Sequence, residues 1–433
     1  MNILLLGSGG REHALSWKLS QSNLCSKLYI APGNAGTAQH GTNLPFAVTD
    51  FESVKKACID NAIEMVIVGP EEPLVKGVVD YLLVESDLDL QIIGPSKEAA
   101  QLEGSKAFAK SFMRRHKIPT ASYQEFNIDN FESGIEYLKK HDLPIVLKAD
   151  GLAAGKGVII CQNHVEAVAE FELMIQRSKF GEAGKRVVVE EFLEGIELSV
   201  FVLTDGKNYV MLPEAKDYKR VGEGDKGLNT GGMGAISPVP FADKNFMDKV
   251  INKIVEPTIN GLQKDNYNYK GFVFIGLMKK GDEPYVIEYN CRMGDPETEV
   301  VLPRIKNDLV ELLMATALER LDTITLSVDN RHAATIVAVS GGYPDAYEKG
   351  FEITGISEHT NNRFLFQAGT KAVDGKIVTN GGRVICGTAL ANDLEEALSR
   401  SRELVDQVNF EGKYYRRDIG FEFFDKSHSE ESE

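Results

Sequence analysis

The chain has 433 residues, of which 43% are hydrophobic and 26% are charged. This composition is that of an ordinary folded protein, so it excludes wholesale disorder, and the length predicts roughly two to four domains. Lys and Arg number 48 against 64 Asp and Glu, which gives a net charge of −16. Such an acidic chain is not expected to bind nucleic acid or an anionic membrane, although a local basic pocket could hold a small anion.

The sequence carries no sign of membrane insertion, export or a disulfide framework. No apolar stretch approaches the roughly 18 residues of a membrane helix, and the first ten residues run into a glycine turn, as a strand does. The cysteines form no CxxC pair, and the eight histidines show no metal-ligand spacing. This pattern favours a cytoplasmic protein without structural zinc. The scattered cysteines are Cys25, Cys58, Cys161, Cys291 and Cys386.

Residues 1 to about 100 alternate strand and helix signals. Apolar runs predict strands at 3–6, 27–30, 65–68 and 91–93, and each run ends at Gly or Pro. Strands with helices between them predict a parallel, doubly wound sheet. Ligands of such sheets bind at the carboxyl ends of the strands.

From about residue 105 the pattern changes to one of hairpins. A helix is expected over 105–116, and glycine-punctuated strands at 145–148, 157–161, 187–192 and 198–203 favour antiparallel sheet. A glycine-rich loop is expected over 222–234, a strand over 286–290 and a helix over 308–318. After residue 325 a third unit is expected, with strands at 332–339, 363–367 and 382–387 and a helix over 393–407. The acidic tail, 427–433, is expected to be disordered.

The first glycine turn, GSGGREHA at 7–14, could bind an anion. Gly7 and Gly9 fit the dinucleotide pattern GxGxxG, but Glu12 occupies the third glycine position and no acidic residue ends the second strand, which disfavours NAD. A glycine turn at a helix N-terminus still presents backbone N–H groups, and Arg11 adds positive charge. The alternative is a plain strand-to-helix turn.

Two lysines flank a loop of small residues at 148–158. The loop could fold over phosphates that Lys148 and Lys156 neutralise. It is not a Walker A loop, because the spacing from Gly151 to Gly155 is too short and a glycine follows Lys156. The alternative is a flexible hairpin with solvated lysines. That alternative fits less well, because Lys148 lies within an apolar strand.

The strand at 286–290 is the most informative segment. Glu288 and Asn290 are two residues apart and therefore share a face, and their oxygens suit Mg²⁺. Arg292 falls on the same face if the strand continues, where it could stabilise charge on a transferring phosphoryl group. The alternative is a half-buried strand with a polar outer face.

Two further segments are open to two interpretations each. The strand at 187–192 is either a hinge whose backbone reads an adenine edge, with Glu197 on ribose hydroxyls, or a strand that ends in a solvated acidic turn. The polar segment at 216–234 is either a mobile substrate loop or a solvated loop.

Together these motifs resemble the ATP-grasp superfamily and, within it, the phosphoribosylamine–glycine ligase family. Four positions depart from the family's pattern, namely Tyr218, Leu228, Met293 and Gln367. The matching segments cover nearly the whole chain: GSGGREHA at 7–14, APGNAGT at 31–37, VGPEEPL at 68–74, DGLAAGKGV at 150–158, EEFLEG at 190–195, LNTGGMGA at 228–235, EYNCRMGDPETE at 288–299, AGT at 368–370, GGRV at 381–384 and RRDIG at 416–420.

The resemblance implies a multidomain architecture of the α/β and α+β classes. An N-terminal, doubly wound parallel-sheet domain (1–103) would bind the ribose phosphate. An ATP-grasp core (104–120 and 191–325) and its lid (121–190) would clamp ATP between antiparallel sheets. A small α+β C-terminal domain (326–426) would complete the core. The enzyme is expected to act as a monomer in the cytoplasm.

The implied reaction joins glycine to 5-phosphoribosylamine with ATP, and gives glycinamide ribonucleotide, ADP and phosphate through glycyl phosphate. It belongs to purine biosynthesis. Glu288 and Asn290 would hold Mg²⁺, with Mn²⁺ as an alternative ion, and Arg292, Lys219 and Asp217 would be catalytic. The residues expected to contact ATP are Lys106, Lys148, Gly151, Ala154, Gly155, Lys156, Gly157, Glu190, Glu191, Phe192, Leu193 and Glu197. The residues expected to contact the other substrates are Gly9, Gly10, Arg11, Glu12, Gly33, Asn34, Glu71, Pro73, Asn229, Thr230, Gly294 and Asp295.

Three rival functions stay open. Another ATP-grasp ligase or carboxylase would share segments 148–157 and 288–290 but differ in the N-terminal loops. A dehydrogenase would bind NAD. A non-catalytic binding protein would lose no function when the charge of Glu288 is removed.

Overall fold

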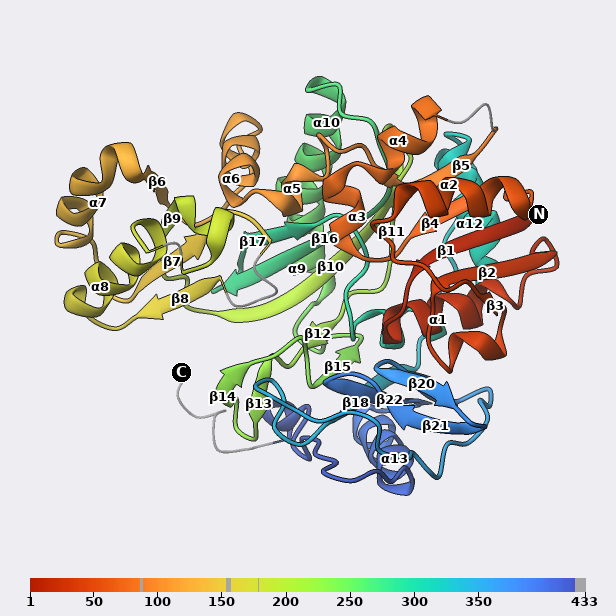
Figure 1. Cartoon of the computed structure of the whole chain (residues 1–433). Coiled ribbons are helices and arrows are strands. Elements are labelled where there is room, and N and C mark those ends of the chain that lie inside the picture. Colours follow the sequence, from red (N-terminus) through yellow and green to blue (C-terminus); the bar gives the residue numbers. More distant parts are fainter. Residues whose placement is uncertain (86–88, 153–156, 178, 425–433) are drawn as a thin grey trace.

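The computed structural model describes residues 1–85, 89–152, 157–177 and 179–424. The chain is arranged as a red N-terminal unit, a green central sheet, a yellow lid and a blue C-terminal unit (Figure 1). Among the described residues, no helix is both long and apolar enough to cross a membrane.

The N-terminal unit is the predicted doubly wound sheet. Its strands are all parallel, in the order β5-β4-β1-β2-β3. Ile3 and Leu5 of β1 belong to the core that includes Leu15 of α1, whereas Leu4 and Leu6 belong to the core that includes Val54 and Cys58 of α2. Helices therefore cover both faces, which confirms the fold class. The elements are β1 Asn2–Gly7, α1 Gly10–Leu19, β2 Lys27–Pro32, β3 Thr42–Asn43, α2 Phe51–Asp60, β4 Met65–Val68, α3 Glu71–Lys76, α4 Val78–Glu85 and β5 Gln91–Pro95.

The parallel sheet continues into the central sheet, which the sequence analysis did not predict. Strand β16 (Tyr269–Lys280) pairs antiparallel with the end of β5, with Tyr269 opposite Pro95. Gly271 lies at this junction with φ 156°, and a Cβ there would lie 3.2 Å from the backbone nitrogen of Gly94. A glycine is therefore needed where the two strands approach. The other central strands are β10 Ile196–Thr204, β11 Tyr209–Met211 and β17 Glu283–Asn290.

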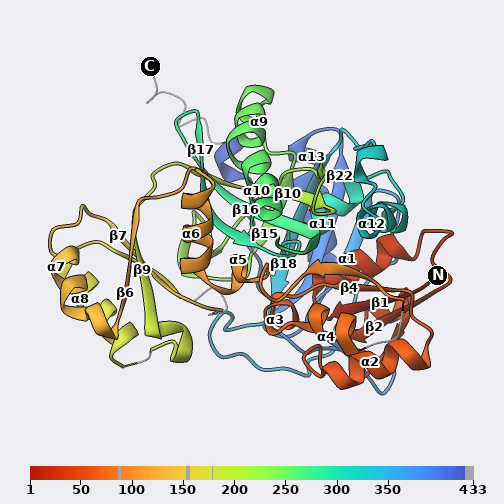
Figure 2. The same ribbon diagram turned by 90° about the horizontal axis from the view of Figure 1, so that it is seen from above.

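The lid is a separate antiparallel sheet with its own apolar core. Its strand order is β6-β9-β7-β8, and α7 and α8 pack on one face. Figure 2 shows the lid standing off from the rest of the chain. The elements are β6 Tyr123–Asn127, α7 Phe131–Leu138, β7 Ile145–Ala149, β8 Val158–Cys161, α8 His164–Ile175 and β9 Arg186–Glu191.

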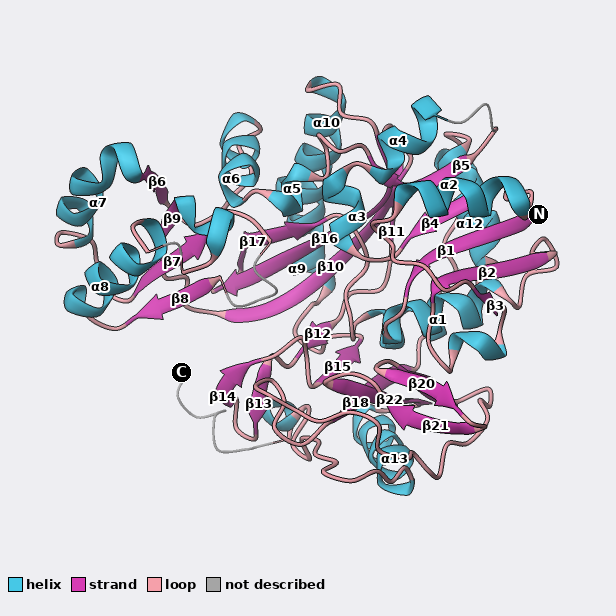
Figure 3. Ribbon diagram, in the orientation of Figure 1, coloured by secondary structure: helices cyan, strands magenta, loops and turns pink. Residues whose placement is uncertain are grey.

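The C-terminal sheet takes two strands from the middle of the chain. Its order is β12-β15-β18-β22-β19, and all neighbours are antiparallel (Figure 3). The prediction of one long loop over 222–234 is wrong, because residues 220–229 form the hairpin β13-β14. The elements are β12 Lys216–Asp217, β13 Arg220–Gly222, β14 Lys226–Asn229, β15 Gly234–Ser237, β18 His332–Val339, β19 Arg363–Gln367, β20 Thr370–Val373, β21 Lys376–Thr379, β22 Arg383–Ala391 and α13 Leu394–Gln407.

The remaining helices connect the units. They are α5 Gln101–Gly104, α6 Lys106–Arg115, α9 Lys244–Val250, α10 Glu256–Lys264, α11 Thr298–Val301 and α12 Leu309–Ala317. Helix α6 begins at the N-cap Ser105, whose side chain accepts the N–H of Phe108. The cap satisfies an N–H of the first turn, and the first lysine of the helix, Lys106, donates to the carbonyl of Gly151.

Candidate functional site

The candidate site is a narrow cavity where β10, β12 and β17 meet. Its charged lining residues are Glu197, Asp217, Lys219 and Glu288. Three carboxylates from three strands, and the ammonium of Lys219 from the loop after β12, therefore face the same space. Such a concentration of charge is typical of a site for a metal ion and phosphates.

Glu288 and Asn290 lie side by side at the end of β17, as the sequence predicts. The amide nitrogen of Asn290 lies 3.5 Å from Glu288 Oε1, and Asn290 Oδ1 accepts from Arg292 Nη2 at 3.2 Å. Gly276 lies opposite Glu288 on β16, and a Cβ there would lie 3.2 Å from Glu288 Cγ. The pair offers a carboxylate and an amide oxygen, which are the hard donors that Mg²⁺ prefers.

Lys219 connects the acidic residues of the cavity. Its Nζ lies 2.6 Å from Glu197 and 3.9 Å from Asp217. Burial opposes the charge of Lys219, but the carboxylates of Asp217 and Glu197 outweigh it and hold the pKa well above its ordinary value. Burial also raises the pKa of Asp217, although Lys219 opposes this shift. Lys219 therefore stays cationic, as binding of an anionic substrate requires.

A buried charge cluster joins the core helix α6 to the lid. The carboxylate of Glu190 on β9 lies 3.0 Å from Lys148 on β7 and 3.2 Å from Lys110 on α6. Burial lowers the pKa of Lys110 to about 8, against the opposing effect of Glu190. The sequence motifs predict Lys148 and Glu190 as site residues, but not Lys110. Its position four residues after Lys106, on the same helix face, was the available signal.

Replacing Lys110 with methionine is expected to raise the KM for ATP three- to tenfold, with a smaller change in kcat. Without Lys110, the carboxylate of Glu190 holds Lys148 alone and draws it away from nucleotide phosphate. Such a change corresponds to about 1 kcal/mol. Steady-state kinetics with varied ATP measures the effect, and Lys140→Met, at an exposed lysine of the lid, is the control. An unchanged KM would contradict this role for Lys110.

The glycine loop is partly described. Ala154, Gly155 and Lys156 lie outside the described residues. Lys106 Nζ donates to the carbonyl of Gly151 at 3.1 Å, so α6 and the start of the loop meet. Gly151 has φ 140°, and a Cβ there would lie 2.8 Å from the Cβ of Ala183. This turn therefore requires a glycine.

The two glutamates of the hinge strand β9 point to opposite faces of the lid. The register places Glu190 on one face with Lys148, and Glu191 on the other face with Ile145 and Leu147. The Glu191 carboxylate accepts the N–H of Ser122 at 2.8 Å. A nucleotide contact from residue 191 would therefore come from its backbone, as the hinge interpretation requires. Phe192 is 38% exposed and Leu193 is buried.

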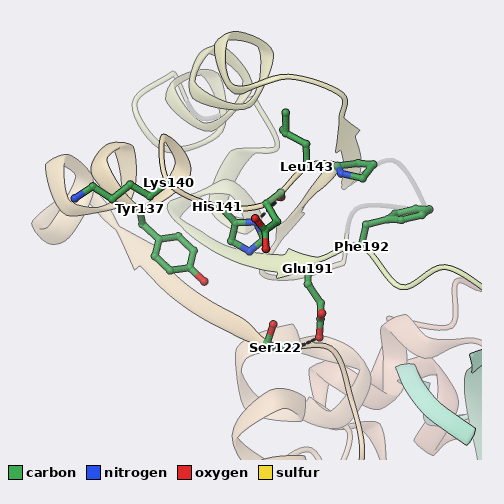
Figure 4. A pocket seen from close by; sticks show the side chains of 9 residues that line it. Ser122, Tyr137, Lys140, His141, Leu143, Glu191 and Phe192 are labelled. Carbon is green, nitrogen blue, oxygen red and sulfur yellow. Dashed lines mark hydrogen bonds between the residues drawn. The ribbon is translucent and has the colours of Figure 1, made fainter.

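A cavity of about 340 Å³ opens on the Glu191 face (Figure 4). In Figure 4 the side chains of Tyr137, Glu191 and Phe192 border this space. Because Lys148 and Glu190 lie on the other face, this cavity is not the predicted nucleotide site. It is lined by Ser122, Tyr137, Lys140, His141, Asp142, Leu143, Pro144, Glu191 and Phe192.

The first glycine turn differs from a free anion site. The N–H of Gly9 donates to Glu12 Oε2 at 2.7 Å, and the N–H of Arg11 donates to Asp295 Oδ2 at 3.1 Å. Arg11 itself is buried and donates to Glu12 Oε1 and to the carbonyl of Met293. Protein carboxylates therefore occupy two of the N–H groups that were expected to face a phosphate. A Cβ on Gly10 would lie 2.4 Å from Glu299, so the turn packs on a buried carboxyl group.

Asn34 ties the N-terminal loops to the C-terminal unit. Its amide nitrogen donates to the carbonyls of Ser8 at 2.8 Å, Gly9 at 3.3 Å and Gln367 at 2.8 Å. Its amide oxygen accepts the N–H of Gly36 at 2.8 Å. The side chain was predicted to contact substrate, but in this structure it holds the loops together.

Arg292 lies between acidic residues of the N-terminal unit and α5. Its Nη2 lies 2.8 Å from Glu103, and its Nε lies 3.3 Å from Glu71. Burial opposes the charge of Arg292, but Glu103 and Glu71 help to raise its pKa. Glu71 was predicted as a substrate residue, and its neighbour Pro73 is buried. Glu103 was missed, because it is separated from Arg292 by 189 residues.

Other predicted substrate residues lie around Asp295. Arg383 lies 3.1 Å from Asp295 Oδ1, and the loop residue Gly294 is buried. The hydroxyl of Thr230 donates to the carbonyl of Lys219 at 2.8 Å, whereas Asn229 is exposed. Gly33 follows β2, and its N–H donates to the carbonyl of Gly7 at 3.0 Å.

Glu297 is a buried acid beside this cluster that the sequence analysis missed. Burial, followed by repulsion from Asp217, raises its pKa to about 7. The hydroxyl of Ser199 lies 3.4 Å from Glu297 Oε1. A buried acid whose pKa is raised by burial and by a neighbouring acid is typical of sites that receive cationic groups or transfer protons.

Replacing Glu297 with glutamine is expected to change how stability depends on pH. The folded chain keeps the Glu297 proton up to about pH 7, whereas the unfolded chain releases it near its ordinary pKa. The stabilisation is thus complete below about pH 4.3 and is lost as the pH rises to about 7. At pH 8 the variant should be about 1–3 kcal/mol more stable than the parent, and near pH 4 the two should agree. Urea unfolding at both pH values measures this, and an equal difference at each pH would contradict it.

Comparison with known proteins places this geometry in a family. Three profiles of one family match in succession: the phosphoribosylglycinamide synthetase N domain over residues 1–103, its ATP-grasp (A) domain over 104–298 and its C domain over 333–422. The phosphoribosylamine–glycine ligase of Haemophilus influenzae is 48% identical over 425 residues, which are 97% of this chain and 98% of that protein. The ligase of Pasteurella multocida is 48% identical over 424 residues, with the same coverage.

Solved structures agree with this assignment. The crystal structure of phosphoribosylamine–glycine ligase from Thermotoga maritima matches with a TM-score of 0.84 and 38% identity, over 96% of this chain and 100% of that chain. The biotin carboxylase domain of the Hydrogenobacter thermophilus 2-oxoglutarate carboxylase matches with a TM-score of 0.74 but 16% identity, over 96% of this chain and 92% of that chain, so it shares the fold alone. With three consecutive profiles matched and relatives covered almost completely, the chain belongs to the phosphoribosylglycinamide synthetase family of ATP-grasp ligases.

Proposed function

We propose that the chain joins glycine to 5-phosphoribosylamine at the expense of ATP, and forms glycinamide ribonucleotide, ADP and phosphate in purine biosynthesis. The observation that carries this proposal is the meeting of Glu288, Asp217 and Lys219 in one cavity, with Asn290 next to Glu288. These residues belong to a chain that is 48% identical to phosphoribosylamine–glycine ligases over nearly its whole length.

Glu288 and Asn290 would hold Mg²⁺, and Mn²⁺ would be accepted at the same oxygen donors. Such an ion supplies charge neutralisation on nucleotide phosphates. Lys106 and Lys148 would approach the phosphates from the core and from the lid. Gly151, Gly157 and the loop residues Ala154, Gly155 and Lys156 would close over them. The stretch from Glu190 to Leu193 would contact the adenine through its backbone, and Glu197 would contact the ribose.

A carboxylate is a poor electrophile, so the carboxylate of glycine must first be activated. Its oxygen attacks the γ-phosphorus of ATP and ADP leaves, which gives glycyl phosphate. The amine of phosphoribosylamine then attacks the acyl carbon, loses a proton, and phosphate leaves. Both reactants are anionic, so Arg292 and Lys219 would lower the barrier by neutralising charge and by positioning the reactants. Asp217 would orient Lys219.

The ribose phosphate would bind where the N-terminal loops meet residues 292–295. The hydrogen bond from Arg11 to Asp295 and the ion pair of Arg292 with Glu71 support this position, because both join the N-terminal unit to the loop after β17. The residues involved would be Gly9, Gly10, Arg11, Glu12, Gly33, Asn34, Glu71, Pro73, Asn229, Thr230, Gly294 and Asp295.

The lid would close during turnover to keep water from glycyl phosphate. The separate apolar core of β6 to β9 supports motion of residues 121–190 as one body.

The other domain boundaries would be 1–103 for the N-terminal domain, 104–120 with 191–325 for the core, and 326–426 for the C-terminal domain. The enzyme would work as a monomer in the cytoplasm. Analytical ultracentrifugation at assay concentrations would test the monomeric state.

The experiment that tests the function is ADP release in the presence of Mg-ATP, glycine and phosphoribosylamine generated in place, with one component omitted at a time. ADP release that needs all three components supports the proposal. ADP release with a different acid or amine would keep an ATP-grasp ligase and change its substrate. No release under any combination, from folded protein that binds ATP, would overturn the proposal.

A further inference from the structure

Three histidines meet away from the nucleotide cavity, between the N-terminal and C-terminal units. His13 lies on α1, His40 follows the short 3₁₀ helix Thr37–Gln39, and His359 precedes β19. One ring nitrogen of each lies within 4.8 Å of those of the other two. His13 is buried, whereas His40 and His359 are half-buried, so an ion could reach the cluster from solvent. The fold assembles this group from residues whose sequence spacing gave no metal signal.

The ring protons of His40 and His359 are held by partners outside the cluster. The Nε2–H of His359 donates to the carbonyl of Leu365 at 3.2 Å, and its Nδ1 is buried with no hydrogen-bond partner among the described residues. The Nδ1 of His40 lies 3.5 Å from the hydroxyl oxygen of Ser20, whose own proton goes to the carbonyl of Trp17. His40 Nδ1 is therefore the donor, and its Nε2 carries a lone pair. A histidine that binds a metal ion holds its other proton in this way.

His13 has the opposite arrangement. Its Nδ1 accepts the N–H of Gln367 at 2.7 Å, so a neutral His13 carries its proton on Nε2. That Nε2 lies 3.2 Å from Nε2 of His40 and donates to it. To bind a metal through Nε2, His13 would have to become an imidazolate or lose the hydrogen bond from Gln367. His13 is therefore poorly suited as a third ligand.

We propose that His40 Nε2 and His359 Nδ1 form a two-histidine site for a borderline divalent transition metal such as Zn²⁺. His13 would then donate a hydrogen bond to a solvent ligand of the ion. Imidazole nitrogen suits Zn²⁺ better than Mg²⁺, so the site does not compete with the oxygen donors Glu288 and Asn290. A water on the ion would release one proton to solvent, and the resulting hydroxide would accept the Nε2–H of His13.

The charge state of the cluster favours a cation. Burial, followed by repulsion from His359, lowers the pKa of His40 to about 4, and burial also lowers the pKa values of His13 and His359. All three rings are therefore neutral at pH 7. The ion would also join two units of the chain, because His40 belongs to the N-terminal unit and His359 to the C-terminal unit. Binding to the folded state alone would raise the midpoint of thermal unfolding.

The test is calorimetric titration of the full chain with Zn²⁺ in excess Mg²⁺, together with thermal unfolding with and without Zn²⁺. The expected result is one Zn²⁺ per chain and a higher unfolding midpoint. His40→Ala and His359→Ala should each weaken Zn²⁺ binding at least tenfold and remove the rise in midpoint. His13→Gln should keep binding within about threefold, and His141→Ala, at a histidine of the lid, is the matched control.

Several results would overturn the proposal. Absence of Zn²⁺ binding by the parent chain would do so, as would unchanged binding in either His40→Ala or His359→Ala. A loss in folded His13→Gln equal to that in the other two variants would replace the pair by a three-histidine site. Should His13→Gln not fold, Co²⁺ absorption of the parent decides between the two arrangements. A pair completed by solvent oxygen ligands gives a different band position and intensity from a three-nitrogen site.

Discussion

Replacing Glu288 with glutamine is expected to lower kcat for ADP release at least 100-fold and to leave the free energy of unfolding within about 1 kcal/mol of the parent. Glu288 is half-buried at the end of β17, and none of the described residues forms an ion pair with it. Its charge favours the cationic forms of Lys106 and Lys219 only from beyond ion-pair distance, so its removal should affect ligand binding more than folding. Glutamine keeps the size of the side chain, so β16 and β17 should stay packed.

The matched control for this variant is Glu283→Gln on the same strand. Glu283 pairs with Lys249 and Lys253 at the far end of β17, and should give normal kcat. Mn²⁺ titration of the nucleotide complex gives a second measurement, in which Glu288→Gln should bind the ion at least tenfold more weakly. Normal turnover by Glu288→Gln would remove the metal role and would favour a non-catalytic binding protein.

The sequence predicts a strand best where a buried apolar run has clearly marked ends. Strands over 65–68, 332–339 and 363–367 were predicted at the observed bounds, because each is an apolar run with abrupt ends. The longest central strand, β16, is absent from the sequence prediction, and Gly271 and Gly276 interrupt its apolar pattern. In the structure both glycines mark close approaches, to Gly94 and to Glu288. A single sequence shows a glycine but not the atom that lies opposite it.

The same limit applies to the site. Motifs identified Glu288, Asn290 and Lys148, because their chemistry is concentrated in short segments. Lys110 and Glu103 were missed, because their partners Glu190 and Arg292 lie far away in the chain. The sequence also does not show which face of the lid sheet Glu190 and Glu191 each occupy. That assignment requires the register of β9 with β7.

The departures from the family pattern lie outside the charged cavity. The hydroxyl of Tyr218 donates to Glu422 at 2.9 Å, and Leu228 is 52% exposed. Met293 is buried, and its backbone carbonyl accepts from Arg11. Gln367 offers its backbone N–H to His13 and its carbonyl to Asn34. At positions 293 and 367 the contacts named here are made by the backbone, so they do not depend on the side chain that departs from the pattern.

Replacing Arg292 with methionine is expected to abolish measurable turnover and to destabilise the fold by about 2–4 kcal/mol at pH 8. The loss of the guanidinium leaves the buried carboxylate of Glu103 without its cation. Burial already raises the pKa of Glu103 and Arg292 opposes that shift, so the variant should raise this pKa further. A raised pKa in the folded state costs stability as the pH rises above the ordinary value, so the defect should be smaller at pH 5 than at pH 8. Urea unfolding at the two pH values measures both.

A double variant separates the structural role of Arg292 from its catalytic role. Glu103→Gln keeps an oxygen that can accept the N–H of Cys291, which donates to Glu103 at 2.7 Å, but removes the charge that Arg292 balances. Combined with Arg292→Met, it should recover most of the lost stability and remove most of its dependence on pH, because the buried charge of Glu103 is gone and the half-buried Glu71 keeps the nearby charge of Arg11. Turnover should stay undetectable, because Arg292 no longer neutralises the glycine carboxylate or the transferred phosphoryl group, and Lys219 alone does not replace it. Recovery of both stability and turnover would mean that Arg292 acts only by holding α5 against β17, and the role of binding substrate charge would pass to Lys219.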